Sequence, residues 1–174
     1  MRGERKISKL VAEFTGCAAT RGDEYMMTFN DGEPMIVWTD GEVAGLNKTW
    51  KYRLKEDYDL NLTKENVFIL SILHELGHVA TLGQFTDKEW EDEFHLKEKI
   101  GEKVTAAEEE NDYDEWFNQN QNYFLMSTEK AATDWAVYQY RNADQCDIRS
   151  WQHRFNCAIK HYEKVSGRKV FEAF

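Results

Sequence analysis

The sequence predicts a single α+β domain, in which a small antiparallel sheet precedes a larger helical part. Short apolar segments separated by turn-forming residues are concentrated in the first third of the chain, whereas apolar residues at helical spacing dominate the rest. The 174 residues are 41% hydrophobic and 14% aromatic, which is sufficient for one compact core. The expected domain therefore spans 1–174.

The first third of the chain contains one expected helix and three expected strands. Apolar residues at helical spacing predict a helix over 3–14. Segments 25–29 and 35–38 flank the turn-forming residues 30–34, and this arrangement predicts a β-hairpin. The alternation of apolar and polar residues over 50–54 predicts a third strand.

The helical part begins with a long apolar segment. This segment is expected to form a helix, with Thr63 as its N-cap and Gly83 at its end. Two amphipathic helices close the expected order of elements, over 128–141 and 147–165.

Most of the net charge of −10 lies in one segment between the long apolar segment and these two helices. Residues 87–115 contain thirteen Asp and Glu against four Lys. A helix is expected over 88–107, and the acidic, amide-rich residues 108–122 are expected to form an exposed loop. We interpret 98–122 as an acidic insertion. Its charge disfavours direct binding to nucleic acid and favours basic protein partners or simple solvation.

The chain carries no feature typical of export or membrane insertion. Its charged start does not resemble a signal peptide, and no stretch of eighteen apolar residues occurs. Cys17, Cys146 and Cys157 include no CxxC pair, which favours free thiols in a reducing compartment. A cytoplasmic protein without membrane contact is expected.

The segment His74-Glu75-Leu76-Gly77-His78 carries the clearest chemical signal. On a helix, residues four apart are offset by about 40°, so both imidazoles project from one face and can reach one metal ion. Zinc suits two imidazoles, a carboxylate and an open position for water. Glu75 then lies beside the open position and is the expected general base that activates the zinc-bound water.

The surroundings of this segment are apolar, and this strengthens the prediction. The alternative is a buried helix whose two histidines only satisfy local hydrogen bonds, but two histidines on an apolar face favour a shared partner. Gly77 costs about 1 kcal/mol relative to Ala in a helix. Its presence therefore predicts that another backbone segment approaches closely.

Glu129 is the best candidate for the third metal ligand. It begins a helix in which Ala132 and Ala136 are small enough for close packing, and Thr133 is placed for a hydrogen bond to a ligand histidine. The alternative is that Glu129 binds no metal and only interacts favourably with the dipole at the N-terminus of this helix, with Ser127 or Thr128 as the N-cap. The rival candidates for this ligand are Asp134, Glu93 and His95, and the last two are expected to face solvent on the acidic helix.

The segment from His74 to His78, followed by Glu129-Lys-Ala-Ala-Thr-Asp-Trp-Ala136, resembles the Glu-zincin metallopeptidases, specifically the ImmA/IrrE type of bacteria and phages. The second helix of that family reads roughly Glu-x-Glu-Ala-Asn-x-Phe-Ala. Four positions fit it (Glu129, Ala132, Trp135, Ala136), and two depart from it (Ala131, Thr133). Thr81 and Gln84 stand where metzincins have Gly and His. The resemblance implies a zincin-like fold, Zn²⁺ held by His74, His78 and Glu129, and cleavage of a protein substrate.

The sequence therefore predicts a zinc-dependent metallopeptidase that hydrolyses peptide bonds in a protein or peptide. The alternative is a zinc-stabilised protein-binding module without turnover that sequesters a partner through its acidic surface. Four residues are candidates, by residue type alone, for stabilising the oxyanion: Tyr123, Tyr138, His153 and His161.

Overall fold

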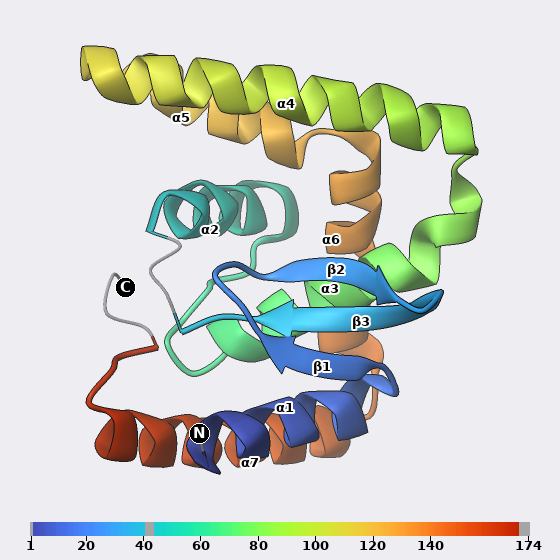
Figure 1. The fold of residues 1–174 in the computed structure, drawn as a ribbon, viewed down its shortest axis with the longest axis vertical. Helices are drawn as coiled ribbons and strands as arrows, with labels where there is room; N and C mark the ends of the chain where they lie inside the picture. Colours follow the sequence, from blue (N-terminus) through green and yellow to red (C-terminus); the bar gives the residue numbers. More distant parts are fainter. Residues whose placement is uncertain (1, 41–43, 171–174) are drawn as a thin grey trace.

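Seven α-helices and a three-stranded sheet make up the part of the chain, residues 2–40 and 44–170, that the computed structural model describes (Figure 1). The elements in chain order are α1 (Arg2–Thr15), β1 (Ala18–Arg21), β2 (Met26–Asn30), β3 (Glu33–Trp38), α2 (Ala44–Tyr58), α3 (Val67–Thr81), the 3₁₀ turn η1 (Leu82–Gln84), α4 (Asp87–Glu110), α5 (Tyr113–Phe124), α6 (Ser127–Asn142) and α7 (Gln145–Ser166). The predicted α+β class and single domain are confirmed, and the molecule is mostly helical.

The sheet has the strand order β1-β3-β2, so β2 lies at one edge. The expected hairpin is present, and Asp31 and Gly32 form its turn with positive φ angles of 51° and 83°. The prediction of a wholly antiparallel sheet is wrong. The unpredicted strand β1 pairs in parallel with β3, with Ala19 opposite Ile36, because the chain crosses to the far edge before the hairpin returns β3 to the centre.

The prediction of a third strand over 50–54 is also wrong, because these residues belong to α2. Trp50 and Leu54 are buried, whereas Tyr52 is exposed. Residues four apart share one helix face, so a five-residue alternation fits a helix as well as a strand. Packing of Trp50 and Leu54 against Val67 and Leu70 of α3 stabilises the helix.

The loop expected over 108–122 is helical instead. Asn111 ends α4 in the left-handed conformation, and the Asp112 side chain accepts a hydrogen bond from the Glu115 backbone at the start of α5. These caps supply the partners that a short polar helix needs. We call α4 and α5 together the α4–α5 hairpin; it contains the predicted acidic insertion at 98–122.

Two expected helix caps are also corrected. Asn66, and not Thr63, occupies the N-cap position of α3, and its side chain accepts a hydrogen bond from the Thr63 backbone at 2.6 Å. The N-cap residue of α6 is Met126, which offers no side-chain acceptor, so neither Ser127 nor Thr128 caps that helix.

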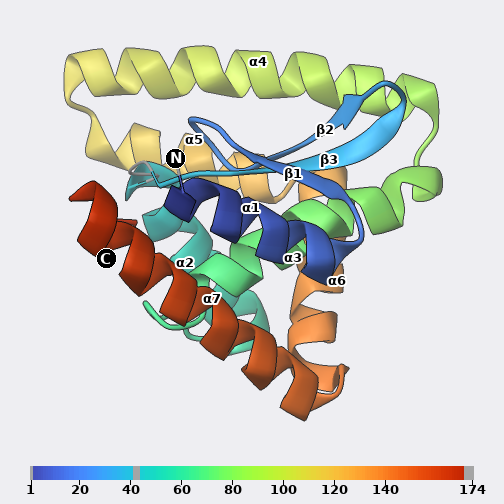
Figure 2. The same ribbon diagram turned by 60° about the horizontal axis from the view of Figure 1, so that its bottom comes forward.

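Helix α3 lies at the centre of the molecule. It packs against α1, α7 and the sheet through one apolar cluster, and against α2 and α6 through a second (Figure 2). The α4–α5 hairpin lies on the β2 side of the sheet, opposite α1 and α7. Within the described ranges, no helix is both long and apolar enough to cross a membrane.

Candidate metal centre

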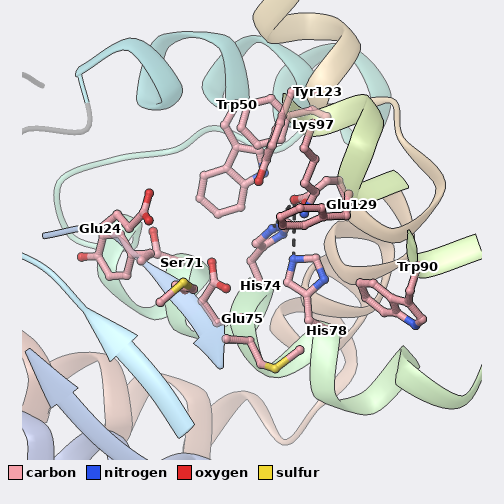
Figure 3. A pocket seen from close by; sticks show the side chains of 15 residues that line it. Glu24, Trp50, Ser71, His74, Glu75, His78, Trp90, Lys97, Tyr123 and Glu129 are labelled. Carbon is pink, nitrogen blue, oxygen red and sulfur yellow. Dashed lines mark hydrogen bonds and ion pairs between the residues drawn. The ribbon is translucent and has the colours of Figure 1, made fainter. Parts of the chain in front are cut away.

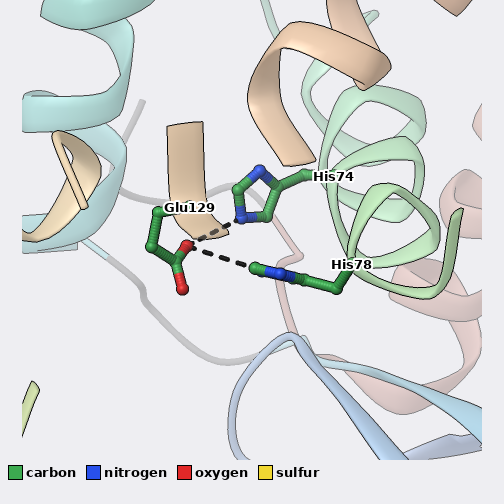
Figure 4. Close-up of side chains that lie close together, drawn as sticks. All are labelled: His74, His78 and Glu129. Carbon is green, nitrogen blue, oxygen red and sulfur yellow. Dashed lines mark hydrogen bonds and ion pairs between the residues drawn. The ribbon is translucent and has the colours of Figure 1, made fainter. Parts of the chain in front are cut away.

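Side chains from α3 and α6 meet in a buried group of metal-ligating residue types, His74, His78 and Glu129, which we call the candidate metal centre and, below, the metal centre. Nε2 of His74 lies 3.1 Å from Oε2 of Glu129, and Nε2 of His78 lies 3.5 Å from the same oxygen (Figure 4). Two atoms bound by a tetrahedral zinc ion lie roughly 3.3 Å apart. Both histidine–carboxylate distances are close to this value, and the ligand atoms of all three side chains lie within 4.8 Å of one another, so the group could hold a metal ion.

The metal centre depends on a close approach between α3 and α6. A Cβ atom at Gly77 would lie 2.5 Å from the carbonyl oxygen of Ala132 and 2.9 Å from its Cα. Ala132 and Ala136 are fully buried. The sequence predicted that another backbone segment approaches Gly77 closely, and that segment is the helix that carries Glu129.

We expect Gly77→Ala to destabilise the protein by about 1–3 kcal/mol, the usual cost of overpacking, despite the better helix propensity of alanine. Gly101 on α4 is the matched control, because a Cβ atom there meets no other atom within 4 Å. Gly101→Ala should stabilise the protein by up to about 1 kcal/mol. Urea unfolding of both variants measures this difference, and equal effects would contradict the close approach.

The two histidines differ in how the protein orients them. Oγ1 of Thr133 lies 3.1 Å from Nδ1 of His74, so the Nδ1–H can donate to the hydroxyl while Nε2 faces Glu129. This is the contact expected of Thr133. Nδ1 of His78 is buried and has no hydrogen-bond partner among the described residues.

Electrostatics in the metal centre favour a charged Glu129. Burial acts to raise its pKa, but hydrogen bonds and charge interactions with His74 and His78 hold the pKa of Glu129 well below its usual range. Burial acts to lower the pKa of His74, yet the Glu129 and Glu75 carboxylates raise it overall. Without metal, the centre therefore favours an imidazolium–carboxylate pair.

The Glu129–His74 pair should contribute most to the stability of the metal-free protein between about pH 4.5 and 6.5, the ordinary pKa values of Glu and His. The lowered pKa of Glu129 contributes stability that is lost as pH falls below that window, and the raised pKa of His74 contributes stability that is lost as pH rises above it. Urea unfolding in chelator should show a weaker alkaline loss in Glu129→Gln than in wild type. Zinc-loaded protein should instead gain stability as pH rises, because its ligands must be deprotonated. Identical alkaline losses in the two metal-free proteins would contradict the pairing.

Glu75 points from α3 toward the cleft beside the metal centre (Figure 3). Its side chain is buried, and this burial raises the pKa of Glu75, while His74, His78 and a hydrogen bond from the Met27 backbone act in the opposite direction. A carboxylate whose pKa is raised toward neutrality is suited to accept and return a proton.

No protein-family model, curated protein or solved structure matches this chain. The resemblance to the ImmA/IrrE type therefore rests on the residues of α3 and α6, and their geometry carries the functional argument.

The metal centre forms one wall of a cleft of about 450 Å³. Its other walls are largely aromatic and come from β2, α2, α4 and α5 (Figure 3). The lining side chains outside the metal centre are Glu24, Tyr25, Met26, Met27, Trp50, Ser71, Glu75, Trp90, Phe94, Lys97, Tyr123 and Phe124.

Of the four candidates for the oxyanion-stabilising residue, only Tyr123 lines this cleft. Burial and the charges of Glu129 and Glu75 raise the pKa of Tyr123, so its hydroxyl keeps its proton and is a donor. Tyr138 is 62% exposed, and His153 and His161 lie exposed on α7.

The rival ligands have other partners. Asp134 accepts hydrogen bonds from Tyr58 and Lys130, and His95 pairs with Glu98 on the exposed face of α4. Glu93 was expected to face solvent, but it accepts hydrogen bonds from Thr128 at the start of α6.

Sequence reasoning missed Trp50, Trp90, Phe94 and Lys97 as residues of the cleft. The last three have the spacing of one helix face. That spacing was the available signal, but it does not reveal what the face contacts.

Proposed function

We propose that this protein is a zinc-dependent metallopeptidase that hydrolyses peptide bonds in a protein or peptide substrate. The observation that carries the proposal is a buried carboxylate within 3.1 and 3.5 Å of two imidazole nitrogens, beside an open cleft and a buried glutamate. A purely structural zinc site is usually closed by four protein ligands. The likeness of α3 and α6 to the ImmA/IrrE type supports the same proposal.

In this proposal His74, His78 and Glu129 hold the metal. Zinc in such a site supplies a Lewis acid that polarises the scissile carbonyl group and acidifies water. Glu75 takes the proton from the attacking water and passes it to the leaving amine as the C–N bond breaks. The Tyr123 hydroxyl donates a hydrogen bond to the developing oxyanion.

The shape of the cleft favours an extended peptide. Strand β2 pairs with β3 on one side, and its residues Met26 and Met27 line the cleft. An extended substrate can hydrogen-bond to such an edge strand. Trp50, Trp90 and Phe94 offer apolar surface nearby, so we propose that a bulky apolar or aromatic side chain lies close to the scissile bond.

The proposal is tested by incubating the zinc-loaded protein with a mixture of synthetic peptides and identifying products by mass spectrometry. We expect cleavage next to bulky apolar residues, loss of cleavage after chelation, and recovery when zinc is restored. A protein that binds one zinc ion per chain and cleaves no peptide would favour the alternative, a zinc-stabilised binding module without turnover.

A further inference from the structure

Helix α4 supplies the cap that the first turn of α6 lacks. The N-cap position of α6 is Met126, so its own sequence provides no acceptor there. Instead, Oε2 of Glu93 accepts hydrogen bonds from the Thr128 backbone N–H at 3.1 Å and from Thr128 Oγ1 at 2.5 Å. A carboxylate at a helix N-terminus satisfies free N–H groups and interacts favourably with the helix dipole. Glu93 therefore anchors the turn that carries Glu129.

One helical turn further along α4, Lys97 contacts Glu129 itself. Its Nζ atom lies 2.5 Å from Oε1 of Glu129, the carboxylate oxygen that is not shared with the two histidines. The Glu129 side chain is 1% exposed, and that of Lys97 is 30% exposed. The ring of Tyr123 lies 5.3 Å from the same ammonium group. The two oxygens of Glu129 thus have separate partners from separate helices (Figure 3).

The separate partners of the two Glu129 oxygens affect how this carboxylate can bind a metal. A carboxylate with one oxygen held by an ammonium group presents only its other oxygen to a metal, in a fixed orientation. Without Lys97, Oε1 would lose its ammonium partner. Leaving a buried carboxylate oxygen without that charged partner costs free energy unless the carboxylate turns or binds the metal differently.

We propose that Glu93 and Lys97 are positioning residues of the metal centre: Glu93 fixes the first turn of α6, and Lys97 fixes the Glu129 carboxylate so that Oε2 alone faces His74 and His78. The acidic α4–α5 hairpin then supplies residues that position the ligands of the metal centre. This inference rests on the proposed binding of zinc by these residues, but not on peptide hydrolysis.

The test compares the zinc affinities of the wild-type chain and five variants, measured by competition with a chromophoric chelator. One of the five, Glu129→Gln, is the reference for a lost ligand. Lys97→Met removes the charge and keeps the length, and Lys97→Arg restores a cation. Glu93→Ala removes the trans cap. Lys99→Met is the matched control, because Lys99 is an exposed lysine of the same helix. Visible spectra of the Co²⁺-loaded proteins report the coordination of the metal independently of affinity.

We expect Lys97→Met and Glu93→Ala each to weaken zinc binding by about 10–100-fold, the usual effect of losing an outer partner of a metal ligand. Lys97→Met should also change the Co²⁺ spectrum, whereas Lys97→Arg should recover most of the affinity and Lys99→Met should match wild type. If the Co²⁺ spectrum changes in Lys97→Met and returns to that of wild type in Lys97→Arg, Lys97 positions the ligand and does not only stabilise the fold.

Wild-type affinity and spectrum in Lys97→Met would overturn the inference while leaving the metallopeptidase proposal intact. A wild type that binds no zinc would overturn both. If circular dichroism shows that Lys97→Met does not fold, Glu93→Ala and Lys97→Arg decide. Unchanged zinc affinity in Glu93→Ala counts against the inference. So does a loss of zinc affinity in Lys97→Arg that is as large as the loss in Glu129→Gln.

Discussion

Glu75→Gln is expected to abolish peptide hydrolysis while zinc content and fold remain those of the wild type. Glutamine has the same shape but cannot accept the proton from water, and a positioned general base contributes about 10²–10⁴-fold to rate. Glu75 is buried, and burial raises its pKa, so the neutral amide should not reduce stability. We expect cleavage to fall by about a thousandfold.

The measurement is the cleavage rate of the best peptide found in the library, with zinc per chain determined on the same samples. Glu91→Gln, which changes an exposed carboxylate of α4, is the control and should cleave at the wild-type rate. Full activity in Glu75→Gln would exclude Glu75 as the base. Loss of zinc together with activity would mean that Glu75 acts on the metal centre instead.

Glu129→Gln is expected to have the largest effect on metal binding. The change keeps the volume of a fully buried side chain but replaces the charged ligand with a neutral amide. It also leaves the ammonium group of Lys97 without its carboxylate partner. Because losing an outer partner alone costs 10–100-fold, we expect zinc affinity to fall by about a hundredfold or more.

Asp134→Asn provides the matched control on the same helix. Asp134 is an exposed carboxylate that pairs with Lys130, away from the cleft. Its replacement should leave zinc affinity unchanged in competition titrations. An equal loss in both variants would mean that the charge of α6, and not ligation by Glu129, governs the affinity.

The sequence predicted the helical frame of the candidate site well, because the signals were local. His74 and His78 are four residues apart on an apolar helix, and that spacing alone places their imidazoles together. The sequence predicted a close backbone approach at Gly77 and close helix packing at Ala132, and in the structure these two residues meet. The proximity of Glu129 and Thr133 to the histidines follows from that contact.

The parts that sequence did not predict depend on tertiary arrangement. Strand β1 is only four residues long, and its parallel pairing with β3 follows from the path of the chain between them. The polar helix α5 is stabilised by its caps and by packing against α4 and α2. Glu93 and Lys97 read as ordinary members of a charged helix, and only the position of α4 over the first turn of α6 brings them to Thr128 and Glu129.

The most direct test of the central claim is X-ray diffraction at the zinc absorption edge from crystals of the zinc-loaded protein. We expect one strong anomalous peak per chain, about 2.0–2.2 Å from Nε2 of His74, Nε2 of His78 and Oε2 of Glu129, with Oε1 of Glu129 still bound to Lys97. A chain without an anomalous peak at these three atoms, in which Glu129 remains paired with the two histidines, would contradict it.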